Sequence, residues 1–251
     1  MTNLFLAITG TIIILSLATG SVFLGKRYGI SYVIATVAAL VIVSNIVAIK
    51  IITLGPLTVP AAIFIFPATF LVTDILTEKW GPSQARRAVW AGFYANLVVV
   101  SAIFVVLKLE PAPFAHDLAS SFDHILGMAP RIVIASLIAY LVSQHHDIFA
   151  FEFWRRFTNG RLLIVRNTAS TTVSQLIDTI LFITIAFGGQ YPLLSPEGID
   201  LVSLITGQYI VKLIISVLDT PFVYLACNAI DKIPPQIGTS GDPDWINYPN
   251  I

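Results

Sequence analysis

Charged and amide side chains interrupt segments of this chain that are otherwise apolar. An ionisable residue inside such a segment is costly in lipid, so by default it faces the protein interior. Successive helix residues turn by about 100°, which puts Gln175 and Asp178 within one polar arc of about 120° in the segment 168–188. Lys212 lies on a similar arc in the segment 200–226. The sequence therefore predicts polar stripes that line one central, partly hydrated cavity.

These polar residues also have structural explanations. Asp178 and Lys212 would form a buried ion pair that only holds helices together. Asp219 would brace the kink that Pro221 introduces, because proline frees a backbone carbonyl. The cluster from Glu78 to Arg87 favours an anchor at the membrane interface.

Enzyme signatures are absent from the sequence. It has no H-E-x-x-H, G-x-S-x-G or G-x-x-x-x-G-K-[ST] motif and a single cysteine, Cys227. His145-His146-Asp147 looks like a fragment of a metal site, but its place at a span end beside Glu152 favours a solvated interface. We predict no enzyme, no cofactor and no metal site.

The whole chain has the composition of a membrane protein. Its 251 residues are 56% hydrophobic and 11% charged, with a mean hydropathy of +0.85 and a net charge of zero. Soluble domains carry about 25% charged residues, and a spanning helix needs roughly 20 mostly apolar residues. Seven windows fit: 4–24, 30–52, 61–79, 86–107, 130–149, 168–188 and 200–226. We predict an all-α integral membrane protein.

Lysine and arginine placement predicts the orientation. One set of alternate connections and the tail hold most of these residues, namely Lys26, Arg27, Lys79, Arg86, Arg87, Arg155, Arg156, Arg161, Arg166 and Lys232. The other set holds Lys108, with Lys50 and Arg131 at span edges. Positive residues favour the cytoplasm, so we expect a multi-pass protein of the cell membrane with the N-terminus outside and the C-terminus inside.

The chain divides into three parts. We predict an additional N-terminal transmembrane helix in 1–28, a six-helix core in 29–232 and an extended Pro/Gly-rich tail in 233–251. The third span is the least hydrophobic, so the sequence does not decide whether it is a continuous, a broken or a re-entrant helix. The long connection 108–129 suits a short amphipathic helix on the membrane surface.

One stretch of the chain carries a specific motif. Phe66-Pro67-x-Thr-Phe-x-x-x-Asp74-x-x-x-Glu78-x-Trp-Gly81 resembles the queuosine-precursor transporter family, also called the vitamin uptake transporter family. Ser44-Asn45, Arg131 to Asp147, Arg166 to Gly188 and Tyr209 to Tyr224 also fit. The resemblance covers about residues 35–230 and implies uptake of 7-deazaguanine bases such as preQ0 or preQ1. It also implies a six-helix core similar to the substrate-binding components of energy-coupling-factor vitamin transporters.

The residue inventory suits such a base. A carboxylate accepts two adjacent N–H donors, amide and ammonium groups donate to a carbonyl, and aromatic faces cover a flat ring. We predict that Asp178 or Asp74 holds the donor edge. The predicted substrate-binding residues are Asn45, Phe66, Phe70, Asp74, Gln175, Asp178 and Lys212. The candidates for coupling or gating are Glu78, Arg131 and Asp219.

Three other functions stay open at this point. A channel needs a repeated ring of oxygens, whereas this polar set mixes both charge signs with aromatic rings and so suits an organic solute. An intramembrane enzyme would use Asp74, Glu78 or the histidine cluster. A substrate-binding component of an ATP-driven transporter would need ATPase subunits, which the sequence neither requires nor excludes. We expect a nucleobase-like substrate, lipid contacts, no nucleic acid and a possible homodimer.

Overall fold

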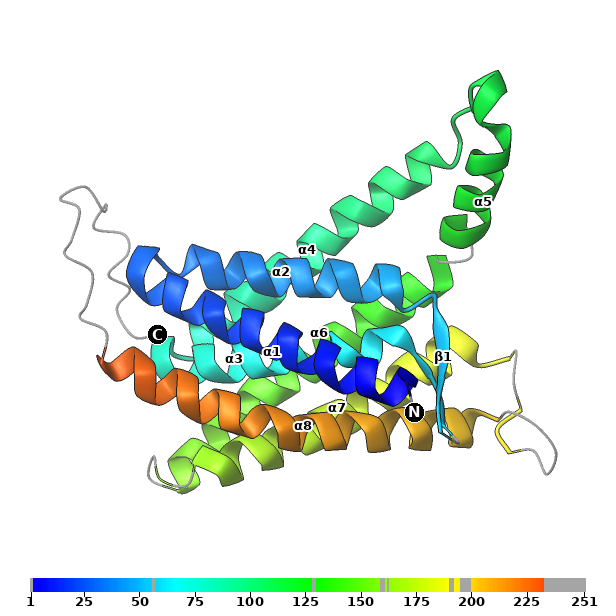
Figure 1. The fold of residues 1–251 in the computed structure, drawn as a ribbon. Coiled ribbons are helices and arrows are strands. Elements are labelled where there is room, and N and C mark those ends of the chain that lie inside the picture. Colours follow the sequence, from blue (N-terminus) through cyan, green and yellow to red (C-terminus); the bar gives the residue numbers. More distant parts are fainter. Residues whose placement is uncertain are drawn as a thin grey trace.

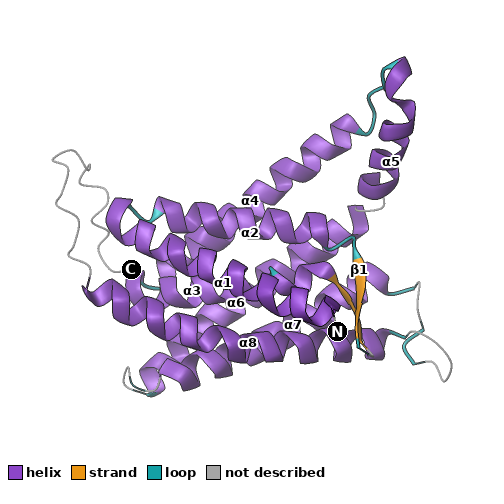
Figure 2. Cartoon of the chain, viewed as in Figure 1, coloured by secondary structure: helices purple, strands orange, loops and turns teal. Residues whose placement is uncertain are grey.

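The computed structural model describes residues 2–55, 57–127, 130–158, 161, 163–189, 192–194 and 200–232. These residues form a helical bundle with one two-stranded hairpin (Figures 1 and 2). The elements in chain order are α1 (Thr2–Tyr28), α2 (Ser31–Val47), β1 (Ile51–Leu54), β2 (Leu57–Pro60), the 3-10 helix η1 (Ala61–Phe64), α3 (Pro67–Trp80), α4 (Pro82–Val106), the 3-10 helix η2 (Pro113–Ala115), α5 (His116–Gly127), α6 (Pro130–Phe157), α7 (Leu163–Phe187) and α8 (Leu201–Lys232). The predicted tail, 233–251, lies outside the described residues.

The helices confirm an all-α membrane protein. Six of the described helical segments are long and apolar enough to cross a membrane, and α2 is a shorter apolar helix. Each of the seven predicted spans overlaps one of these segments. The division into an additional first helix and a six-helix core stays a prediction.

The second predicted span ends earlier than the sequence suggested. Helix α2 stops at Val47 after 17 residues, and Ile51–Leu54 forms a strand instead of continuing the helix to residue 52. Ile51, Ile52 and Thr53 are β-branched, which favours the extended backbone. Gly55 has a φ of 59°, a left-handed conformation that suits the tight turn pairing Leu54 with Leu57.

The third span is broken rather than one continuous α-helix. The 3-10 helix η1 runs first, and α3 then begins at Pro67, a residue favoured in the first helical turn because its missing N–H is not needed there. Helix α3 has only 14 residues, and every residue from Pro67 to Thr77 is buried. A helix buried on all sides belongs to the interior of the bundle.

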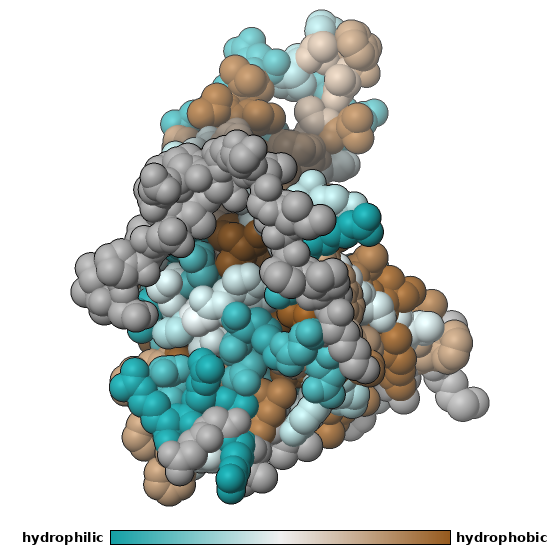
Figure 3. Space-filling view, turned by 90° about the vertical axis from the view of Figure 1, so that its left-hand side faces the viewer, coloured by the Kyte–Doolittle hydropathy of each residue, from teal (hydrophilic) through white to brown (hydrophobic). Residues whose placement is uncertain are grey.

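The other helices surround α3. It contacts α1, α2, α4, α6 and α8, while α6 packs along α7 and α7 along α8. In Figure 1 the α1–α2 turn, the α3–α4 turn and the last turns of α6 and α8 lie at one end of the bundle, and the hairpin lies at the other. Figure 3 looks onto the first of these ends, where hydrophilic residues gather beside hydrophobic flanks. The polar end is the one that carries the predicted cytoplasmic set of basic residues.

Helix α4 slants away from the bundle in its second half, and α5 lies beyond it (Figure 1). Helix α5 confirms the helix predicted between residues 108 and 129. Leu118, Phe122 and Ile125 recur at helical spacing and are exposed, as an amphipathic helix requires. Its position on a membrane surface stays a prediction.

Candidate functional site

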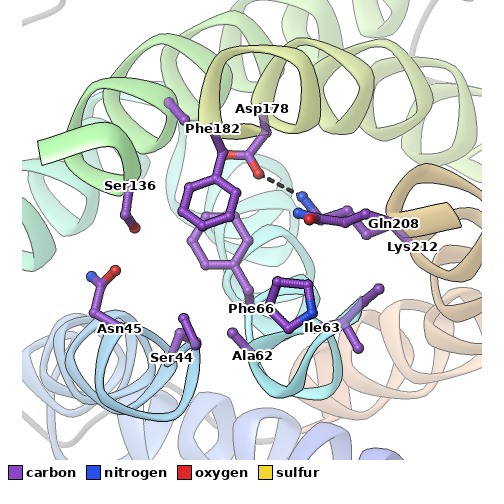
Figure 4. A pocket seen from close by; sticks show the side chains of 13 residues that line it. Ser44, Asn45, Ala62, Ile63, Phe66, Ser136, Asp178, Phe182, Gln208 and Lys212 are labelled. Carbon is purple, nitrogen blue, oxygen red and sulfur yellow. Dashed lines mark hydrogen bonds and ion pairs between the residues drawn. The ribbon is translucent and has the colours of Figure 1, made fainter. Parts of the chain in front are cut away.

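A pocket lies in the half of the bundle near the hairpin, where α2, η1, α6, α7 and α8 meet. Phe66, at the start of α3, and Phe182, from α7, present their rings to it (Figure 4). The pocket is lined by Ser44, Asn45, Ala48, Pro60, Ala62, Ile63, Phe66, Ser136, Ala139, Asp178, Phe182, Gln208 and Lys212. Four of the predicted substrate-binding residues, Asn45, Phe66, Asp178 and Lys212, therefore come together from separate helices.

An ion pair forms one wall of the pocket. Lys212 Nζ on α8 donates to Asp178 Oδ2 on α7 over 2.5 Å, shown as a dashed line in Figure 4, and also to Thr179 Oγ1 over 3.1 Å. Ser143 Oγ on α6 donates to the other carboxylate oxygen over 3.1 Å. Lys212 Nζ lies 5.4 Å from the centre of the Phe66 ring, at cation–π distance. The pair is buried, so each charge depends on the other for its stabilisation.

Neutral polar groups also line the pocket. Asn45 donates to the Val41 carbonyl over 3.2 Å, and Figure 4 shows its amide facing the Ser136 hydroxyl across the pocket. Gln208 reaches in beside Lys212, and its Oε1 has no hydrogen-bond partner in the described part of the chain. Ser44 Oγ is likewise buried without one. The pocket therefore offers unused polar groups around an aromatic centre.

The pocket is narrow in this conformation. About 30 Å³ is open to the centres of water molecules, and one water needs roughly 10–15 Å³ of such space. A bicyclic base therefore needs side chains to move before it fits.

The three remaining predicted binding residues do not line the pocket. Phe70 is fully buried behind it, with its ring 5.8 Å from that of Phe66 in an edge-to-face contact. Gln175 is fully buried one turn from Asp178, and neither of its amide atoms has a partner among the described residues. Asp74 belongs to a second polar layer deeper in the bundle.

This second layer is an acid cluster, made of Asp74 on α3, Asp147 on α6 and Asp219 on α8. All three are buried, and Asp74 lies against Asp147. Thr171 donates to Asp74 Oδ2 over 3.1 Å. The prediction that Asp147 lies in a solvated interface at a span end is wrong. Asp147 is buried because α6 continues to Phe157 and does not stop near residue 149.

Between the pocket and the acid cluster lies a neutral hydrogen-bonded layer. Gln144 on α6 donates to Thr69 over 2.9 Å and accepts from Thr73 over 3.0 Å, both on α3. These bonds join α3 to α6 through buried side chains, which fixes the position of Phe66 above and Asp74 below.

Charged pairs close the polar end of the bundle. Arg166 on α7 donates to both oxygens of Glu78 on α3, over 2.7 and 3.2 Å, and Arg155 on α6 approaches Glu78 to 3.9 Å. Lys79 on α3 pairs with Asp231 on α8 over 2.7 Å. The predicted gating candidate Glu78 therefore ties three helices together at this end.

The other gating candidates lie apart from Glu78. Arg131, near the start of α6, donates to the carbonyls of Ile185 and Gly188, where α7 ends. Asp219 stands two residues before Pro221 in α8, but its Oδ1 is buried without a partner among the described residues, so Asp219 faces the acid cluster.

Two pocket residues, Phe182 and Gln208, were not among the predicted substrate-binding residues. Phe182 follows Asp178 by four residues and Gln208 precedes Lys212 by four, so helical spacing from a predicted residue would have found both. Asn167 on α7 and Asp147 on α6 are buried outside the pocket and were not among the predicted site residues. In the described part of the chain, no group of three or more His, Cys, Asp or Glu side chains has a geometry that could hold a metal ion.

Comparison with known proteins gives the family. Residues 60–226 match the family model described as "Putative vitamin uptake transporter". The chain is 35% identical over 226 residues to a "Probable queuosine precursor transporter" of Bacillus subtilis, an alignment that covers 89% of this chain and 92% of that protein. It is 30% identical over 127 residues to the "Queuosine precursor transporter" of Escherichia coli K12, covering 49% of this chain and 53% of that protein. No solved structure matches. The chain belongs to the queuosine-precursor transporter family, the family of vitamin uptake transporters whose motif lies on α3.

Proposed function

We propose that this protein imports queuosine precursors, 7-deazaguanine bases such as preQ0 and preQ1, through the pocket at Asp178 and Lys212. Membership of the transporter family supports import of such a base. The observation that carries the choice of site is a buried carboxylate beside aromatic rings and the unpaired oxygens of Gln208 and Ser44.

Lys212 and Ser143 donate to the two carboxylate oxygens of Asp178, and a substrate can replace these donors. A 7-deazaguanine edge presents two adjacent N–H donors, and a carboxylate accepts two such donors in parallel. When the base binds, these two donors take over the oxygens held by Lys212 and Ser143. The ammonium group of Lys212, or the amide of Gln208, is then available to the carbonyl of the base. Asn45 stands across the pocket to complete recognition of the ring.

Aromatic side chains hold the flat body of the base. Phe66 and Phe182 both present rings to the pocket, and stacking on an aromatic ring contributes about 0.5–1.5 kcal/mol beyond burial. Because the pocket is narrow, we infer that these rings separate when the base enters.

Transport then requires the two ends of the bundle to open in turn. We infer an orientation in the cell membrane with the polar, arginine-rich end in the cytoplasm and the hairpin outside. In the described conformation the Glu78–Arg166 pair closes the cytoplasmic side. The base leaves chemically unchanged, so the protein acts as a transporter rather than an enzyme, and it works without ATPase subunits.

Liposomes that contain only the purified protein test this proposal. We expect them to exchange a labelled 7-deazaguanine base across the membrane, and the base recovered should be intact by chromatography. A thermal-shift titration with deazapurines and purines ranks the substrates, because a ligand stabilises the folded state in proportion to its occupancy.

Two aspartate variants locate the site. Asp178→Asn removes a charge-assisted acceptor worth about 1.5–3 kcal/mol, so it should weaken base binding about tenfold or more. Asp231→Asn is the matched control, because it removes the same charge from an Asp–Lys pair that joins α8 to α3 outside the pocket. Unchanged binding by a folded Asp178→Asn protein would refute the site, and flux of inorganic ions in place of bases would refute the function.

A further inference from the structure

Three carboxyl groups meet in the acid cluster, about two turns of helix below the pocket. Asp74, Asp147 and Asp219 come from α3, α6 and α8 and are 1%, 0% and 1% exposed. Asp74 and Asp147 are within hydrogen-bonding reach of one another, and Asp219 lies close enough to both to interact electrostatically. Two carboxyl groups form such a hydrogen bond only when one of them holds a proton.

Positive charge does not neutralise this cluster in the described part of the chain. Arg166 pairs with Glu78, Lys212 with Asp178 and Lys79 with Asp231. His146 bonds to Ser174. The other titratable groups on the surrounding helices are His145, Glu152, Arg155, Tyr140, Tyr209, Tyr224, Cys227 and Lys26 with Arg27 at the end of α1. No ion pair joins His145, Arg155 or Lys26 to the three aspartates among the described residues.

The neighbouring hydroxyl groups do not supply the missing donors. Ser170, Thr171 and Ser174 lie within reach of Asp147. A hydroxyl has one proton, and these three donate theirs to the Asn167 carbonyl, to Asp74 and to the Ser170 carbonyl. Both oxygens of Asp147 are therefore left without a donor from the described residues.

A buried amide points to the same place. Asn167 on α7 is 1% exposed and lies beside Asp219, yet neither its Nδ2 nor its Oδ1 forms a well-aligned hydrogen bond with a described residue. An orphaned amide next to unpaired acids marks a site whose ligand completes the network.

We propose that Asp74, Asp147 and Asp219 form a proton-binding site, and that a proton taken up there drives import of the base. A proton between Asp74 and Asp147 converts two opposed acceptors into a donor and an acceptor. It also removes the cost of a second buried negative charge. This coupling rests on the proposed function of the pocket.

Polar side chains join the acid cluster to the pocket along two helices. On α7, Thr171 touches Asp74, Gln175 follows one turn later, and Asp178 lies in the pocket wall. Gln175 is fully buried with both amide atoms free of described partners, so it is available to bond in either direction. On α8, Lys212 and Asp219 stand two turns apart. Protonation of the cluster and occupation of the pocket therefore act on the same two helices.

The geometry favours a proton over a metal cation. Thr171 directs its hydroxyl proton at Asp74, whereas a metal ion would need the oxygen lone pair there. Among the described residues, no group of three or more His, Cys, Asp or Glu side chains could hold a metal ion. Sodium is the alternative that the experiment must separate.

Liposomes that contain the full-length protein test the coupling. With one proton per base, an inward gradient of one pH unit should accumulate the base about tenfold, since a tenfold ratio costs about 1.4 kcal/mol. A trapped pH dye should report proton entry together with the base. Asp147→Asn should lose this accumulation and proton entry while it still exchanges labelled base for unlabelled base without a gradient. Asp231→Asn should behave as the unsubstituted protein.

Infrared spectroscopy gives a readout that does not need transport. At neutral pH the unsubstituted protein should show the carbonyl band of a protonated carboxyl group. Asp147→Asn should lose it, because Asp74 is then ionised beside an amide donor, and Asp178→Asn should keep it. A thermal melt establishes that each variant is folded.

The outcomes separate the two proposals. Base exchange without proton entry, or accumulation driven by a sodium gradient, would overturn the proton site and leave the transport function intact. An absent carboxyl band, or one unchanged in folded Asp147→Asn, would also overturn it. A protein that exchanges no base at all would refute the proposed function instead.

Discussion

Replacing Lys212 by methionine should sharply destabilise the protein. The side chains of Lys212 and Asp178 are 2% and 5% exposed, and their atoms meet over 2.5 Å. Methionine fills similar space but leaves Asp178 charged, buried and held by Ser143 alone. Removing one partner of a buried pair costs about 3–5 kcal/mol. For a chain of 150–250 residues each kcal/mol lowers Tm by about 2–4 °C, so Tm should fall by about 6–20 °C.

A thermal melt in detergent, followed by tryptophan fluorescence, measures this change. Lys79→Met is the matched control, because Lys79 pairs with Asp231 at a site where the two side chains are 17% and 65% exposed, and such exposed pairs contribute less than about 1 kcal/mol. The double variant Lys212→Met with Asp178→Asn should regain most of the lost Tm, since no unpaired charge remains. Equal, small shifts for Lys212→Met and Lys79→Met would refute the buried pair.

Three further substitutions probe other contacts. Glu78→Gln should speed base exchange and lower Tm, because the hydrogen bonds to Arg166 lose their charge. An exchange rate equal to that of the unsubstituted protein would argue against a gate at Glu78. Phe66→Leu should weaken base binding about two- to tenfold in a titration, since stacking contributes about 0.5–1.5 kcal/mol, and unchanged affinity would remove this ring from the site. Gly92→Ala should lower Tm, because a Cβ at residue 92 would lie 2.7 Å from Tyr140 Oη, and overpacking costs about 1–3 kcal/mol; an unchanged Tm would mean that the tyrosine moves freely.

Helical periodicity was enough to predict the centre of the pocket. Asp178 and Lys212 each lie on a polar arc of an apolar helix, and two such arcs lower their energy in lipid by facing each other. The prediction worked although the two residues lie on separate helices, because an ionisable residue inside a span is stabilised mainly by facing the protein interior.

Contacts that depend on helix ends and tilts could not be predicted in this way. Asp147 was assigned to a span end because the hydropathy falls there, while α6 in fact runs ten residues beyond it to Phe157. The β1 strand was assigned to a helix because a short apolar run has no period that distinguishes the two. Whether Glu78 pairs with Arg166, 88 residues away, depends on how α3 and α7 are set side by side.

The short helix α3 has a mechanical consequence. Phe66, Asp74 and Glu78 lie along about 18 Å of this one helix, at the levels of the pocket, the acid cluster and the Glu78–Arg166 ion pair. Neighbouring helices pack around α3. We therefore expect α3 to stay fixed while the outer helices rotate relative to it. One continuous stretch of sequence, residues 66–81, therefore positions side chains at all three levels, and the same stretch carries the family motif.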